Sequence, residues 1–288
     1  MNVGKFGQFN RIVIKVGSAL LLNKNEGFNR SWLNNLSNEI EQLHNRHTEI
    51  LIVSSGAVAI GSTYLKKKRS HMNLNEMQAA AAMGQAQLVM EWQDSFKSSG
   101  INTAQILLTR SDTENKKRFL NSKDTLLTLI KYDVIPIINE NDTVATEELR
   151  YGDNDRLAAR VAQMTSADLL ILLSDVDGMY TSNPKANQTA KHIPVIENLN
   201  EEIFSMADTA DSNYGSGGMI TKLKAAKIAT SAGCSTIVTD GLKIAPLTSL
   251  IEGGKCTYFP ARSNSKSSRK QWLKGYLDTS GSLSLIHI

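Results

Sequence analysis

Two groups of small and polar residues, far apart in the sequence, carry the kinds of side chain that handle phosphate. The first is Gly152-Asp153-Asn154-Asp155, which follows the block Asn139-Glu140-Asn141-Asp142. The second is Gly215 to Lys222, in which glycines precede a lysine. Acids, amides and glycines grouped with a cation suggest an anionic phosphate donor and a small zwitterionic acceptor.

The glycine run predicts a loop that leads into a helix, because Leu223, Ala226 and Ile228 follow it at helical spacing. Backbone N–H groups and the helix dipole at such an N-terminus favour phosphate. The run is not a Walker A loop, and it is not a full dinucleotide fingerprint, since Ile220 stands where a third glycine would fall. Taken alone it also fits a plain glycine turn.

Two lysines strengthen the phosphate interpretation. Lys15 follows the apolar run Ile12-Val13-Ile14 and precedes Gly17, while Lys222 lies at the end of the segment that begins with the glycine run. Two ammonium groups that converge on one phosphoryl group can stabilise its transfer. Taken alone, Lys15 also fits a strand-end lysine in solvent, so the hypothesis requires the two lysines to meet in the fold.

The acidic and amide residues allow several roles. Asp155 precedes a helical pattern and can cap that helix. The wider set that includes Asn139 and Asp142 can bind a substrate ammonium, hold the lysines, or ligate Mg²⁺ directly or through water. The five histidines show no catalytic or zinc pattern. A carboxylate acceptor, with a reference pKa of about 4.3, is already ionised at neutral pH and needs no general base.

Short runs rich in Ile, Val and Leu alternate with helical patterns, which predicts an α/β three-layer sandwich with a mostly parallel central sheet. Helices are expected over residues 32–43 and 74–97. Ligands bind beyond the carboxyl ends of such strands, where this chain places small polar residues. The expected strands are Ile12–Ile14, Ile50–Val53, Ile106–Leu108, Val134–Ile138, Leu169–Leu173 and Thr236–Val238.

Composition narrows the class of protein. Of the 288 residues, 41% are apolar and 21% charged, as in ordinary globular proteins, and the net charge of +4 is mildly basic. Aromatic residues do not interleave with the basic runs, which disfavours a nucleic-acid partner. No apolar stretch approaches the ~18 residues of a membrane span, and Cys234 and Cys256 form no metal-type pair, so we expect a cytoplasmic protein.

From about Arg11 to Leu273 the chain resembles the glutamate 5-kinase family, of the amino acid kinase fold. We expect a kinase domain over residues 1–260 and a tail over 261–288 without the PUA domain that many members carry. The matching motifs are Ile14 to Ser18, Val53 to Val58, Ile106 to Arg110, Arg118 to Asn121, Pro136 to Asp142, Gly152 to Asp155 and Gly217 to Lys222.

The resemblance implies ATP-dependent phosphorylation of the side-chain carboxylate of L-glutamate, the first step of proline synthesis. By motif position, Lys15 and Lys222 would stabilise the transferred phosphoryl group and Asp155 would orient them. The substrate-binding residues would be Ser55, Asp142 and Asn154. The nucleotide-binding residues would be Lys15, Ser174, Asp175, Ser216, Gly217, Gly218, Met219, Ile220, Thr221 and Lys222.

The resemblance further implies that Mg²⁺ lies mainly on the nucleotide phosphates rather than in a protein metal site. It implies a homodimer or homotetramer and a glutamyl phosphate reductase that takes up the labile product.

Two alternative functions are considered. One is a different kinase with the same fold, and the other is a protein that binds the amino acid without catalysis. A relative such as acetylglutamate kinase or UMP kinase is disfavoured by Asn139-Glu140-Asn141-Asp142. A silent amino-acid sensor is disfavoured by both lysines and Asp155, because a sensor needs no phosphoryl clamp.

Overall fold

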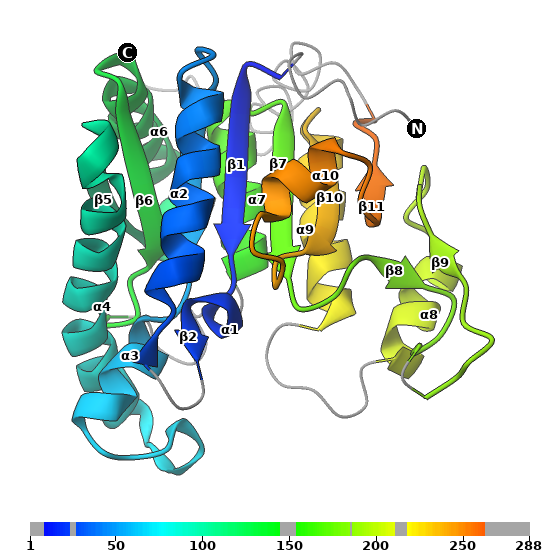
Figure 1. The fold of residues 1–288 in the computed structure, drawn as a ribbon, viewed down its shortest axis with the longest axis horizontal. Coiled ribbons are helices and arrows are strands. Elements are labelled where there is room, and N and C mark those ends of the chain that lie inside the picture. The colour runs from blue at the N-terminus through cyan, green and yellow to red at the C-terminus, as the bar shows by residue number, and fades with distance from the viewer. Residues whose placement is uncertain (1–8, 24–26, 145–153, 185, 211–217, 263–288) are drawn as a thin grey trace, which may run out of the picture.

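The computed structural model describes residues 9–23, 27–144, 154–184, 186–210 and 218–262. In this part of the chain a seven-stranded sheet lies between two layers of helices (Figure 1). The strand order is β11-β10-β7-β1-β4-β6-β5, and all neighbours are parallel except β10 and β11. The strands are β1 (Arg11–Val16), β4 (Glu49–Ser54), β5 (Asn102–Leu108), β6 (Val134–Glu140), β7 (Leu169–Ser174), β10 (Ser235–Asp240) and β11 (Cys256–Phe259).

The six predicted apolar runs are the six parallel strands, so the three-layer α/β sandwich with a mostly parallel sheet is confirmed. Three features were not predicted. The antiparallel edge strand β11 is one, and the others are two short antiparallel pairs outside the main sheet. These pairs are β2 (Leu22–Asn23) with β3 (Gly27–Phe28) and β8 (Met179–Tyr180) with β9 (His192–Ile193).

The helices form two layers with separate hydrophobic cores. α2 and α4, with α1, α3 and α10, pack on one face of the sheet, and α6, α7 and α9, with α8, pack on the other. The predicted helices over 32–43 and 74–97 are α2 and α4. The helices are α1 (Ser18–Leu21), α2 (Arg30–His44), α3 (Ala57–Tyr64), α4 (Leu74–Phe96), α5 (Arg110–Glu114), α6 (Lys116–Lys131), α7 (Asn154–Thr165), α8 (Glu201–Ala210), α9 (Met219–Ser231) and α10 (Pro246–Ile251), with 3₁₀ turns at Arg69–His71 and Lys97–Ser99.

The central strand β1 shows how the sequence sets the layers. Ile12 and Ile14 belong to the core under α2 and α4, whereas Val13 belongs to the core under α7 and α9. All three are fully buried, and each such side chain stabilises the fold by about 1.5–3 kcal/mol. Since side chains alternate along a strand, Lys15 shares the face of Val13. Its ammonium therefore points toward the first turns of α7 and α9.

α3 and α4 cross at very short range because both carry glycine at the contact. A Cβ on Gly84 would overlap the carbonyl oxygen of Ala57, and a Cβ on Gly61 would overlap that of Ala80. The crossing holds the start of α3, where Gly56 has a φ of 124° that favours glycine. In this way α4 fixes the backbone that follows β4.

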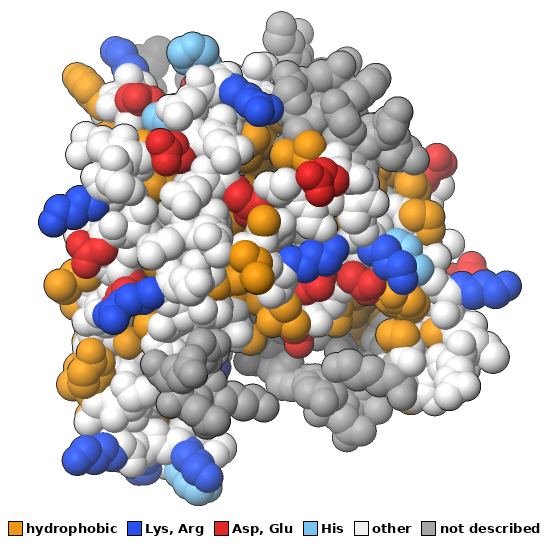
Figure 2. Space-filling view, in the orientation of Figure 1, with side chains coloured by type: hydrophobic (Ala, Val, Ile, Leu, Met, Phe, Trp, Pro, Cys, Tyr) orange, Lys and Arg blue, Asp and Glu red, His pale blue; other side chains and the backbone are white. Residues whose placement is uncertain are grey.

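The predicted domain boundary at residue 260 falls directly after β11. The tail beyond residue 262 lies outside the described residues, so the division at 260 stays a prediction. None of the helices in the described segments has the length and apolar character to cross a bilayer. On the face drawn in Figure 2, acidic and basic side chains are interspersed.

Candidate active site

A cavity of about 650 Å³ opens beyond the carboxyl ends of β1, β4, β6, β7 and β10. Its centre lies at β1, which pairs with β4 on one side and with β7 on the other. Ligands bind at such switch points of parallel sheets. Polar residues that line the cavity include Lys15, Ser18, Ser55, Arg69, Asn139, Glu140, Asp142, Asn154, Ser174, Asp175, Asp177, Tyr180, Asn183, Lys222 and Asp240.

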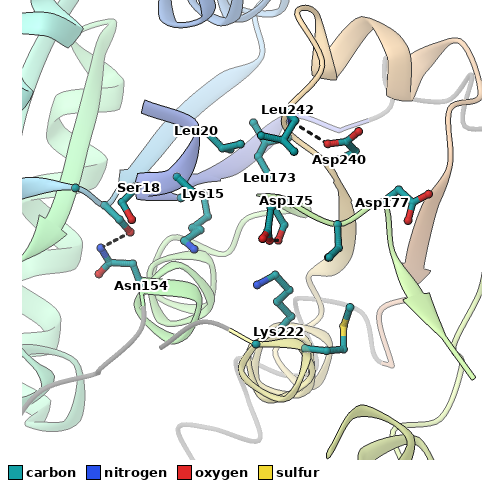
Figure 3. Close-up of a pocket in the computed structure, with 18 of the residues that line it drawn as sticks. Lys15, Ser18, Leu20, Asn154, Leu173, Asp175, Asp177, Lys222, Asp240 and Leu242 are labelled. Atoms are coloured by element: carbon teal, nitrogen blue, oxygen red, sulfur yellow. Dashed lines mark hydrogen bonds between the residues drawn. The ribbon is translucent and has the colours of Figure 1, made fainter. Parts of the chain in front are cut away.

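Lys15 and Lys222 meet at one carboxylate on the cavity floor. Lys15 Nζ lies 2.5 Å from Asp155 Oδ1, and Lys222 Nζ lies 3.3 Å from Asp155 Oδ2. Figure 3 shows the two lysines, from β1 and α9, pointing into the same space. All three groups are buried, with exposed fractions of 7%, 4% and 0% for Lys15, Lys222 and Asp155. Two ammonium groups thus share one carboxylate, and this triad favours an additional anion in the cavity.

The ion pairs also set the charge of Asp155. Burial by itself raises the pKa of this carboxyl group, but the attraction of Lys15 and then of Lys222 outweighs burial and lowers the pKa to about 2. Asp155 is therefore ionised at neutral pH. It also lies in the first turn of α7, where the helix dipole favours a negative charge.

The helix predicted to follow the glycine run is α9, while the run before Gly218 lies outside the described residues. Gly218 is the N-cap of this helix, and Gly218 and Met219 line the cavity together with Lys222. Thr221 Oγ1 donates a hydrogen bond to the Gly218 carbonyl at 2.7 Å and lies 3.3 Å from Asp155 Oδ2. The N-terminus of α9 thus opens beside the lysine pair. Ser216 and Gly217, also predicted to hold the nucleotide, lie outside the described residues.

Ser55, Asn139 and Asn154 form a hydrogen-bonded group on the β4 and β6 side of the cavity. Asn154 Nδ2 donates to Ser55 Oγ and to Asn139 Oδ1, both at 2.8 Å. Figure 3 shows Asn154 at the edge of the cavity, with a dashed line that marks a hydrogen bond of its side chain. Asp142 lines the same cavity, just beyond the end of β6. The three predicted substrate-binding residues, Ser55, Asp142 and Asn154, are therefore brought to one cavity.

Ser174 and Asp175 lie on the other side of the lysines, at the end of β7. Ser174 is buried and its hydroxyl donates to Asp175 Oδ1 at 3.2 Å, while Asp175 is exposed and faces the cavity. Of the remaining predicted nucleotide-binding residues, Ile220 and Thr221 are on α9 but are not part of the cavity wall. No group of three or more metal-binding side chains occurs among the residues that the structure describes.

Several residues that line the cavity or contact its lining are not singled out by the sequence. Asp240 ends β10 as Ser174 ends β7, so the rule of polar residues after strands could have found it. Arg69 belongs to a basic run interpreted as solvated, and it is exposed but also borders the cavity. Gln85, which contacts Asn139, lies in the middle of α4 and carries no sequence signal.

Comparison with known proteins gives one family throughout. Residues 10–240 match the model of the amino acid kinase family. The chain is 49% identical over 282 residues to glutamate 5-kinase of Rhodopseudomonas palustris (strain BisB5), which covers 98% of this chain and 75% of that relative. It is 48% identical to glutamate 5-kinase of Bartonella henselae, over 97% of this chain and 74% of that relative.

Solved structures with low sequence identity share the fold. UMP kinase from Ureaplasma parvum matches with a TM-score of 0.59 and 19% identity, over 87% of this chain and 98% of that one. Carbamate kinase from Giardia lamblia, bound to AMP-PNP, matches with a TM-score of 0.62 and 16% identity, over 88% of this chain and 99% of that one. These likenesses support the three-layer architecture.

Proposed function

The chain belongs to the glutamate 5-kinases of the amino acid kinase family, and from this premise we propose which residues perform the reaction. The enzyme transfers the γ-phosphoryl group of ATP to the side-chain carboxylate of L-glutamate, which starts proline synthesis. We assign stabilisation of the transferred group to Lys15 and Lys222 and their positioning to Asp155. The observation that carries this assignment is the single carboxylate shared by the two lysines.

The chemistry needs positive charge rather than a base. A carboxylate oxygen of glutamate forms a bond to the γ-phosphorus while the bond from that phosphorus to the β,γ-bridging oxygen breaks, and ADP leaves. No proton moves, because the acceptor is already ionised. Charge on the transferred group is balanced by the two ammonium groups. Asp155 stays ionised beneath them and keeps both side chains aimed at the cavity.

The two sides of the cavity suit the two substrates. Ser55, Asn154 and Asp142 are proposed to bind glutamate, with the carboxylate and carbonyl oxygens accepting from its ammonium group. Ser174, Asp175 and residues 216–222 are proposed to hold the nucleotide, with its phosphates at the N-terminus of α9. When bound, Mg²⁺ neutralises phosphate charge. It prefers oxygen ligands and keeps several waters, so we place it mainly on the nucleotide, with the exposed Asp175 nearby.

The remaining expectations are part of the same proposal. We propose a cytoplasmic enzyme that acts as a homodimer or homotetramer. An acyl phosphate hydrolyses readily in water, so a reductase that consumes glutamyl 5-phosphate is the proposed next partner. The division into a kinase domain over 1–260 and a tail over 261–288 also stands as a proposal.

Hydroxylamine trapping tests the activity directly. Purified protein, ATP and Mg²⁺ are mixed with L-glutamate, N-acetylglutamate or UMP, and both hydroxamate and ADP are measured. We expect hydroxamate and equal ADP with L-glutamate, and neither above background with the other two. Glutamate binding seen by calorimetry without ADP release would instead favour the sensor alternative.

A further inference from the structure

We propose that Gln85, on α4, is a positioning residue that sets the direction of the Asn154 amide through Asn139, and so presents the Asn154 carbonyl oxygen to the ammonium group of glutamate. This inference rests on the proposed glutamate side of the cavity. Gln85 is buried, with 7% of its surface exposed, and is not part of the cavity wall. It therefore acts on the substrate only through other side chains.

The hydrogen bonds form a continuous relay. Gln85 Oε1 accepts from Asn139 Nδ2 at 2.7 Å. Asn139 Oδ1 accepts from the backbone N–H of Glu140 at 2.8 Å and from Asn154 Nδ2 at 2.8 Å. Asn154 Nδ2 places its second hydrogen on Ser55 Oγ. Four side chains from α4, β6, α7 and the segment after β4 are thus joined.

The direction of every amide in the relay follows from one fixed donor. A backbone N–H can only donate, so the Glu140 N–H requires the oxygen of Asn139 on its side. The nitrogen of Asn139 must then face Gln85, and the nitrogen of Asn154 must face the oxygen of Asn139. Both hydrogens of Asn154 Nδ2 are used in this way, which leaves its oxygen as the remaining polar group.

That oxygen matches the proposed substrate. Among the described residues, Asn154 Oδ1 is a buried acceptor with no hydrogen-bond partner. Asn154 lines the cavity beside Ser55 and Asp142. A buried acceptor without a donor is unfavourable until one arrives, and the ammonium group of an amino acid carries three donors. The relay therefore prepares an acceptor for that group.

The relay uses only the oxygen of Gln85. Gln85 Nε2 is buried and has no partner among the described residues. Replacement of this amide nitrogen by oxygen consequently removes no hydrogen bond, whereas removal of Oε1 leaves the buried Asn139 Nδ2 without an acceptor. Gln85→Glu and Gln85→Met have similar length and separate these two cases.

Steady-state kinetics on the full chain test the proposal. We expect Gln85→Met to raise the KM for glutamate about tenfold, with kcat and the KM for ATP within about twofold of wild type. Gln85→Glu should keep the wild-type glutamate KM. Gln87, which lies on the same helix and donates to Glu91, provides the matched control, and Gln87→Met should change none of these constants. If Gln85→Met does not fold, Gln85→Ser removes the same acceptor by shortening the side chain.

Asn154→Ala separates this proposal from the proposed function. If Gln85 acts through Asn154, adding Gln85→Met to Asn154→Ala should raise the glutamate KM no further. Asn154→Ala with a raised KM beside Gln85→Met with a normal KM overturns the relay alone. An unchanged KM in Asn154→Ala overturns both assignments. Equal rises in the glutamate and ATP KM values of Gln85→Met, without recovery in Gln85→Glu, indicate a general packing defect and also overturn the relay.

Discussion

Asp155 Oδ1 lies 2.5 Å from Lys15 Nζ, although the two residues come from a helix start and a strand end far apart in the sequence. The other oxygen of the same carboxylate holds Lys222. This sharing explains why two like charges can lie together at the cavity floor, since each is stabilised by the same anion. Substitutions at Lys222 and at Asp155 therefore test two different properties, the rate of transfer and the pH dependence of stability.

Lys222→Ala should lower kcat by about 10²- to 10³-fold with little change in the glutamate KM, because in the proposed assignment the ammonium stabilises charge on the transferred group rather than bound glutamate. The measurement is steady-state kinetics with both substrates varied. Lys224 lies on the same helix and is exposed, so Lys224→Ala is the control and should retain wild-type kcat. An unchanged kcat in Lys222→Ala would remove this lysine from the mechanism.

Asp155→Asn should change how stability depends on pH. The folded-state pKa of Asp155 is lowered to about 2, so its contribution is fully present above the unfolded-state pKa and is lost as pH falls toward 2. This contribution amounts to about 2 kcal/mol. Urea unfolding at a series of pH values should show the wild-type advantage over Asp155→Asn shrinking between about pH 5 and pH 2. A constant difference over that range would contradict the assigned ionisation.

Asp142→Ala should chiefly raise the glutamate KM, because Asp142 lines the cavity on the side of Ser55 and Asn154. Loss of a charge-assisted contact to the substrate ammonium predicts a rise of about tenfold or more. Asp124, on the surface helix α6, is exposed and serves as a control when changed to alanine. A defect confined to the ATP KM would show that Asp142 does not bind glutamate.

Gly84→Ala should destabilise the fold by about 3 kcal/mol or more, because the added methyl group meets the backbone of Ala57 rather than a side chain that can move. Helix propensity alone predicts the opposite sign, a gain of about 1 kcal/mol. The free energy of unfolding in urea distinguishes the two. Ala82→Gly, at an exposed position of the same helix, should lose about 1 kcal/mol and calibrates the propensity effect. A stabilised Gly84→Ala would show that α3 and α4 do not cross as closely as described.

The parallel strands were predictable because burial on both faces makes each of them a continuous apolar run, as in Leu169 to Leu173. β11 was not, because an antiparallel edge strand of four residues with Thr257 and a half-buried Tyr258 shows no such run. The short pairs β2–β3 and β8–β9 are set by loop contacts that no periodic pattern reports. The periodicity of the sequence therefore predicts the fold class. It does not predict the edge strand or the short antiparallel pairs.

The residues of the candidate site also divide into those that the sequence predicts and those that it does not. Residues such as Lys15, Ser55 and Ser174 follow or end strands, and strand order alone brings them to one edge of the sheet. The meeting of Lys15 and Lys222 at Asp155 was a hypothesis, because it depends on how β1, α7 and α9 pack against one another. The contact between Gln85 and Asn139 could not be predicted, because nothing in the sequence of α4 shows which of its residues faces β6.

The position of β1 between β4 and β7 has a consequence for how the polypeptide matures during translation. Lys15 lies near the N-terminus, yet its partner Asp155 follows much later, and Lys222 emerges a further 67 residues on. An unfinished polypeptide therefore lacks the cation that completes the centre. Both ammonium groups are in place at Asp155 only after α9 has been synthesised and has packed beside α7.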